Sequence, residues 1–108
     1  MSTNVDRFTI KVGNRAPSIQ YQLFLTTVDL TGATVRFHMR NKAGKVIVDQ
    51  AGNVDNISTR KVSYDWQAGD TDTAGEYFGE FEVTYSDTKK ETFPADAEIP
   101  ITVRPVIA

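Results

Sequence analysis

The sequence predicts an all-β fold, an immunoglobulin-like antiparallel β-sandwich of about seven strands. Apolar and polar residues alternate within most of the predicted strands. This alternation places one face of each strand in a core and the other face in water. Turn-forming pairs such as Gly13-Asn14 and Ala43-Gly44 separate these stretches. No stretch has the i, i+3, i+4, i+7 apolar spacing of a helix longer than a turn or two.

The first three strands are expected in FTIKV, SIQYQLFL and ATVRFHMR, at residues 8–12, 18–25 and 33–40. Each alternates at period two, so that Val35, Phe37 and Met39 share a face opposite the charged residues of their strand. The glycine turn in RNKAGKVIV then predicts a hairpin to a short fourth strand at residues 46–48.

The last three strands are expected in KVSYDWQ, EYFGEFEVTYS and IPITV, at residues 61–67, 76–86 and 99–103. Their alternation points one set of large side chains inward, and these are expected to determine the fold. The fold-determining aromatic residues are Tyr64, Trp66, Tyr77 and Phe81.

Length and composition limit the class of protein. The 108 residues suit a single domain (1–108, core about 6–105). Twelve basic against fourteen acidic residues give a net charge of −2, which disfavours nucleic acid as a partner. The chain has no cysteine, no apolar run of the roughly 20 residues that span a membrane, and no signal-peptide pattern at its start. These features predict a soluble globular protein of cytoplasmic origin.

The acidic stretch AGDTDTAGEYFGEF, residues 68–81, raises the question of a metal site. An EF-hand loop is excluded, because the position of its essential bidentate glutamate is a phenylalanine. A looser calcium site using Asp70, Asp72 and Glu76 stays open. A structural corner is favoured: Gly75 supplies backbone freedom before a strand, and Tyr77 is placed like the tyrosine of the tyrosine corner.

The residues offer no catalytic site and no cofactor site. His38 is the only histidine and lies between two arginines on a polar strand face, where a solvated surface residue is expected. A catalytic triad or a multi-histidine metal centre would need partners that the sequence does not show. We therefore predict a protein that is not an enzyme and binds no cofactor.

Apolar residues at positions expected to face water are the better lead to function. Phe24, Ile47 and Phe78 interrupt polar faces, and Phe93 precedes a proline in a predicted loop. If these residues cluster, they would form a patch of the kind that marks a partner surface. If they are isolated on the surface, they need no functional explanation.

The motifs LTGATVRFHMRN, KVSYDWQAGDTDTAGEYFGEFEVTYSD and ETFPADAEIPITVRP together resemble the N-terminal immunoglobulin-like domain family of phage baseplate upper proteins. The resemblance covers residues 8–104. The sequence differs from those of antibody domains in having Gly79 where the second disulfide cysteine would fall. The family implies a β-sandwich adaptor without a cofactor, packed into a virion by protein contacts.

The resemblance predicts a non-enzymatic structural component of a tailed-phage virion, in the baseplate, tail, neck or head. Its expected partners are other virion proteins in a symmetric multi-copy assembly, with no nucleic acid and no membrane, and its expected location is the virion. The position on the particle stays open. The alternative is a carbohydrate-binding module for attachment to host glycans, which the weakness of Phe as a sugar platform disfavours.

Overall fold

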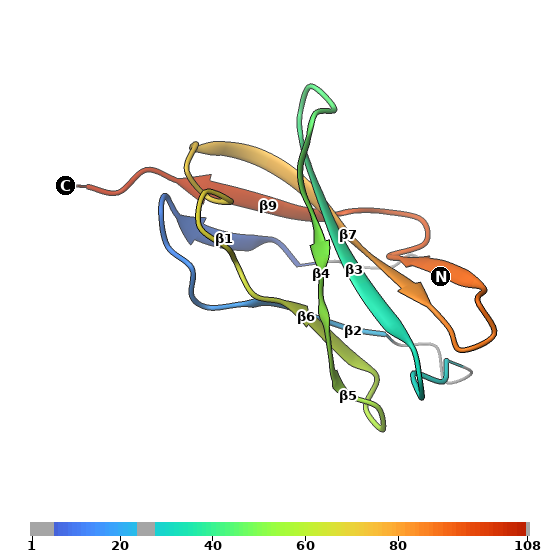
Figure 1. The fold of residues 1–108 in the computed structure, drawn as a ribbon. Helices are drawn as coiled ribbons and strands as arrows, with labels where there is room; N and C mark the ends of the chain where they lie inside the picture. Colours follow the sequence, from blue (N-terminus) through green and yellow to red (C-terminus); the bar gives the residue numbers. More distant parts are fainter. Residues whose placement is uncertain (1–5, 24–27, 108) are drawn as a thin grey trace.

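The computed structural model describes residues 6–23 and 28–107, in which the chain forms nine β-strands in two sheets packed face to face (Figure 1). This confirms the predicted all-β sandwich. No helix in these two ranges is long and apolar enough to cross a membrane. The strands are β1 (Phe8–Lys11), β2 (Ile19–Gln22), β3 (Thr34–Asn41), β4 (Val46–Ala51), β5 (Asn53–Asn56), β6 (Lys61–Tyr64), β7 (Gly75–Thr84), β8 (Lys90–Phe93) and β9 (Ile99–Arg104).

The larger sheet has six strands in the order β1-β9-β7-β3-β4, with β8 also paired to β7. Strands β3 and β7 pair over eight residues, from Thr34 opposite Thr84 to Asn41 opposite Tyr77, and form its centre. The smaller sheet has the order β2-β6-β5. The chain passes from β4 to β5 through Gly52, whose amide donates to the Val35 carbonyl at 2.8 Å, and so moves directly from one sheet to the other.

One strand pair differs from the antiparallel expectation. Strand β1 runs parallel to β9, with Phe8 opposite Ile101 and Lys11 opposite Arg104. A tight hairpin forces its two strands to be antiparallel, but these two strands lie at opposite ends of the chain and no hairpin joins them. Alternation alone therefore could not decide their relative direction.

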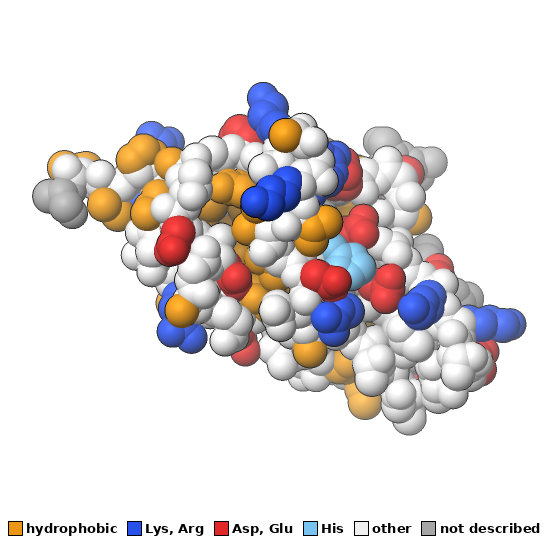
Figure 2. Space-filling model, turned by 45° about the horizontal axis from the view of Figure 1, so that its top comes forward, with side chains coloured by type: hydrophobic (Ala, Val, Ile, Leu, Met, Phe, Trp, Pro, Cys, Tyr) orange, Lys and Arg blue, Asp and Glu red, His pale blue; other side chains and the backbone are white. Residues whose placement is uncertain are grey.

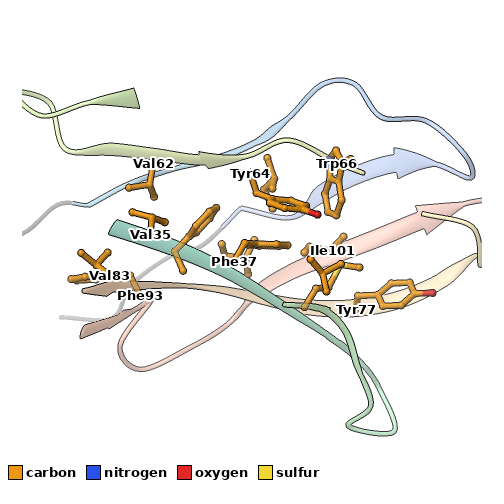
Figure 3. Packing of buried hydrophobic residues seen from close by; sticks show 14 of the residues in the cluster. Val35, Phe37, Val62, Tyr64, Trp66, Tyr77, Val83, Phe93 and Ile101 are labelled. Atoms are coloured by element: carbon orange, nitrogen blue, oxygen red, sulfur yellow. The ribbon is translucent and has the colours of Figure 1, made fainter. Parts of the chain in front are cut away.

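The core lies between the sheets and centres on Phe37, which is fully buried. Its ring lies 4.8 Å from that of Tyr64, 5.0 Å from that of Phe81 and 5.8 Å from that of Trp66, between centroids. Figure 3 shows the rings of Phe37 from β3 and Tyr64 from β6 meeting between the two layers, with Trp66 beside them and Ile101 below. All of these side chains occupy positions that the alternation assigns to the inward face.

Gly79 is the one inward position of β7 that carries no side chain, and the core around it explains why. A Cβ atom added there would lie 2.8 Å from Cδ1 of Ile101 and 3.0 Å from two ring atoms of Phe37. Real Cβ atoms essentially never show a contact as short as the one with Ile101, and the contacts with Phe37 would also require the ring to shift. The large neighbours fill the space in which the cysteine of an antibody domain would lie.

Candidate functional site

Three of the four residues proposed as an interface patch are described by the structure, and these three do not form one. Phe93 is buried, because β8 pairs with β7 and places Phe93 directly opposite the core residue Phe81. Paired residues of adjacent strands point to the same face of a sheet, so Phe93 points inward and its assignment to an exposed patch is wrong. Ile47 is half-buried against the core, and Phe24 lies outside the described residues. Among the three that the structure describes, Phe78 lies half-buried on the outer face of the six-stranded sheet.

The acidic stretch at residues 68–81 forms a corner. The Asp70 carboxylate accepts hydrogen bonds from the Tyr64 hydroxyl at 2.5 Å and from the Gln67 amide at 2.8 Å. The Tyr77 hydroxyl donates to the Thr73 carbonyl at 2.6 Å, four residues upstream, in the manner of a tyrosine corner. This bond closes the turn just before β7, which Gly75 begins at φ +154°.

The Asp70, Asp72 and Glu76 side chains do not converge as a cation site. Glu76 instead pairs with Arg7, whose Nη1 lies 3.0 Å from Oε1 of Glu76. Among the residues that the structure describes, no group of three or more His, Asp or Glu side chains is placed to hold a metal ion.

A more organised set of polar groups lies on the outer face of the six-stranded sheet, around His38. On β3, His38 is directly opposite Asp49 of β4 and directly opposite Glu80 of β7. Its Nε2 lies 3.3 Å from Oδ1 of Asp49, and its Nδ1 lies 3.2 Å from Oε2 of Glu80. A neutral imidazole can donate from only one nitrogen, so both contacts become hydrogen bonds together only in the imidazolium form. The two nitrogens point to opposite sides, which explains why the three groups do not surround one metal position.

Two residues further along β3, the next row of cross-strand neighbours on the same face holds a cation over an aromatic ring. Arg40 of β3 is opposite Phe78 of β7, and its guanidinium carbon lies 4.7 Å from the centre of the Phe78 ring. The same guanidinium donates to Oε2 of Glu98 from Nη2 at 2.8 Å and from Nε at 3.2 Å. An arginine is thus held between an apolar surface and a carboxylate.

These two rows border a hollow of about 420 Å³ on the sheet surface. We call it the sheet-face hollow; it is lined by His38, Met39, Arg40, Val46, Asp49, Phe78, Gly79, Glu80 and Glu98. Figure 2 shows the histidine on this face with acidic side chains around it. A second, more open depression of about 460 Å³ shares Glu80 and Glu98 and adds Asp96, so the acidic surface continues toward the loop before β9.

Sequence reasoning placed His38 on the outer face but missed the groups that surround it. Asp49, Glu80 and Glu98 belong to three different strands or flanking segments, and only the strand register brings them together. The available signal was the alternation in the predicted strand at residues 76–86, which places Glu80 at an outward position; Asp49 and Glu98 lie just outside the predicted strands.

The interactions of the Asp49 carboxylate predict that the stability of the fold depends on pH. The Arg36 guanidinium, whose Nε lies 2.5 Å from Oδ1 of Asp49, holds the pKa of that carboxyl below its usual range, and the charge of His38 acts in the same direction. A carboxyl whose pKa is lower in the folded state stabilises the fold above its unfolded pKa of about 3.9, and this contribution is lost as the pH falls through the folded pKa.

We therefore expect Asp49→Asn to be less stable than the parent protein at neutral pH, with the difference shrinking as the pH falls from about 5 to below about 3. Urea unfolding midpoints of both proteins across this range measure it. A difference that stays constant down to the acid end would show that the Asp49 charge does not stabilise the fold.

Comparison with known proteins gives a likeness of fold. No family model matches the chain, and no curated protein matches it. Among solved structures, the chain is similar to CopC from Methylosinus trichosporium OB3b, with a TM-score of 0.58 and 14% sequence identity, over 94% of this chain and 87% of the CopC chain. At this identity the likeness shows the fold, a β-sandwich.

This comparison contradicts the predicted function. The prediction of a structural component of a tailed-phage virion, with a carbohydrate-binding module as its alternative, is wrong, because the fold likeness points to CopC and away from a virion protein. The resemblance to the baseplate domain family, on which that function rested, stays an untested prediction, as do the virion location and partners. The residues of the sheet face must therefore carry the functional argument by themselves.

Proposed function

We propose that this chain is a non-enzymatic binding module that uses the sheet-face hollow to hold a lysine-type cationic side chain of a partner protein. The observation that carries the proposal is the combination of Phe78 and Val46 with the carboxylates of Asp49, Glu80 and Glu98 in one hollow. A lysine side chain has the matching construction, since its methylene stem packs on apolar surface while its ammonium group seeks carboxylates.

The charge of this surface favours a cation. The sheet-face hollow and the adjoining depression together present the carboxylates of Asp49, Glu80, Asp96 and Glu98. The guanidinium groups near these carboxylates are those of Arg40, in the lining, and Arg36, beside Asp49. Even with His38 counted as a cation, these four carboxylates outnumber the positive groups, so the surface keeps an excess of negative charge.

Arg40 shows within the chain how such a site holds a cation. Its guanidinium lies over Phe78 and its nitrogens reach Glu98, so one aromatic face and one carboxylate together position a positive charge. Within the described ranges, the charged partners of Glu80 and Asp49 are His38 and Arg36, and both carboxylates face the same hollow. A second cation from outside would find the same kind of environment beside Arg40.

The chemistry of the hollow favours binding over catalysis. Among the residues that the structure describes, its lining contains no serine, threonine, cysteine or lysine that could act as a nucleophile beside His38. The imidazole is instead held between two carboxylates, an arrangement that fixes the ring and completes a charged surface.

The proposal is tested by titrating the ¹⁵N-labelled protein with a short, capped peptide of alternating glycine and lysine. We expect saturable shifts of the amide signals of His38, Asp49, Phe78, Gly79 and Glu80. Exposed ion pairs contribute about 0.2–1 kcal/mol each, so Glu80→Gln should weaken binding by roughly 1.5- to 5-fold.

Two controls make the result specific. Asp55→Asn removes a carboxylate from the exposed strand β5 of the other sheet and should leave the affinity unchanged. A peptide of alternating glycine and glutamate should not bind. Shifts that spread over both sheets, or that respond equally to Glu80→Gln and Asp55→Asn, would contradict the proposed site.

A further inference from the structure

We propose that the partner is a second copy of this chain, whose β3–β4 hairpin tip carries the lysines that enter the sheet-face hollow. This inference rests on the proposed function and adds the identity of the partner.

The hairpin tip is built as a defined loop. The Asn41 amide donates to the Lys45 carbonyl at 2.9 Å, and the Gly44 amide donates to the Asn41 carbonyl at 3.0 Å. The Asn41 side chain closes the turn by accepting from the Lys45 amide at 2.9 Å, and Gly44 supplies the positive φ of +92° that this turn requires. A tip held in this way loses little conformational freedom on binding.

The tip presents cationic and apolar groups to solvent. Residues 42–45 are all exposed, and Val46 beside them keeps 60% of its surface exposed. Within the described part of the chain, neither Lys42 nor Lys45 forms an ion pair with a carboxylate. Figure 1 shows the β3–β4 hairpin extending beyond the rest of the sandwich, at the top of the view. The tip is therefore accessible to another molecule.

The tip and the hollow complement each other in charge, and among the described residues no ion pair joins Lys42 or Lys45 to a carboxylate of the hollow of the same chain. Arg40 and Val46, at the base of the hairpin, form one wall of the hollow. From there the strands run away from the hollow to the turn, and the pairing of Asn41 with Lys45 holds them in that direction. Two lysines and a rigid turn therefore face outward, while a hollow rimmed by Asp49, Glu80 and Glu98 lies open beside them. A two-fold arrangement of two copies lets each tip enter the hollow of the other.

The experiment is sedimentation velocity on the full chain and two charge variants. The hairpin variant is Lys42→Glu/Lys45→Glu, and the hollow variant is Glu80→Gln/Glu98→Gln. The parent protein is expected to self-associate at about 1 mM or below, and to dissociate as salt approaches about 1 M, where charges are screened within about 3 Å. Each variant alone should associate at least about fivefold more weakly, since the first reverses the charge of both tip lysines and the second removes two of the three rim carboxylates.

Mixing the two variants gives the decisive result. An equimolar mixture contains intact tips on one chain and intact hollows on the other, so association should reappear in the mixture while both components alone stay monomeric. A parent protein that stays monomeric at about 1 mM in low salt overturns the inference, as does a mixture that associates no better than its components. If the glycine–lysine peptide still binds in that case, the hollow remains a lysine site and only its assignment to a second copy is wrong.

Discussion

Phe37→Ala is expected to lower the free energy of unfolding by about 3–5 kcal/mol, because it removes a fully buried ring from the centre of the core. Three aromatic rings, those of Tyr64, Trp66 and Phe81, lie within 5.8 Å of it between centroids and would line the resulting cavity. Since domains of this size are stable by about 5–15 kcal/mol, urea unfolding should show a large shift of the midpoint.

Phe78→Ala is the matched control, because it deletes the same ring from the same central strand pair on the outer face. It loses a half-buried contact and the Arg40 guanidinium above the ring, so we expect a cost below about 2 kcal/mol. Equal costs for the two substitutions would show that the assignment of inner and outer faces is wrong.

Gly79→Ala is expected to destabilise the fold by about 1–3 kcal/mol, although it adds only a methyl group. The added Cβ would overlap Cδ1 of Ile101 and the ring of Phe37, and both belong to the core. Equilibrium unfolding in urea measures the cost, and circular dichroism checks that the variant keeps its strands.

A second substitution tests this cause. Ile101→Val deletes the Cδ1 atom that would lie 2.8 Å from the new Cβ, at its own cost of about 0.5–1.5 kcal/mol. The double variant Gly79→Ala/Ile101→Val should be more stable than the sum of the single costs predicts. Strict additivity would mean that Ile101 is not the source of the strain.

Most of the strands could be predicted because their residues carry a local signal. In β7, alternate residues from Tyr77 to Val83 are buried, as period-two spacing requires of a strand with one face in the core. β5 and β8 were missed, since NVDN and KETF have no such alternation. Both form because a neighbouring strand offers an edge with which they pair. Such pairing produces no recognisable pattern in a sequence of four residues.

The loop assignment of Phe93 failed for the same reason. Nothing near it in the sequence shows that Lys90–Phe93 pairs with β7, and this pairing is what turns its side chain toward Phe81. The conformation of the corner was easier to anticipate, because Gly75 and Tyr77 act on backbone groups only a few residues away.

Local alternation and turn chemistry in the sequence therefore determined the fold class, the inward aromatic residues and the polar outer face, because these depend on neighbours within one strand or turn. Tertiary structure alone decided the parallel β1–β9 pair, the burial of Phe93 and the grouping of Asp49, Glu80 and Glu98 around His38 and Phe78. These features depend on register between strands far apart in the chain. A shift of one residue in that register would move Asp49 or Glu80 to the other face of the sheet, so the candidate site exists only in the folded molecule.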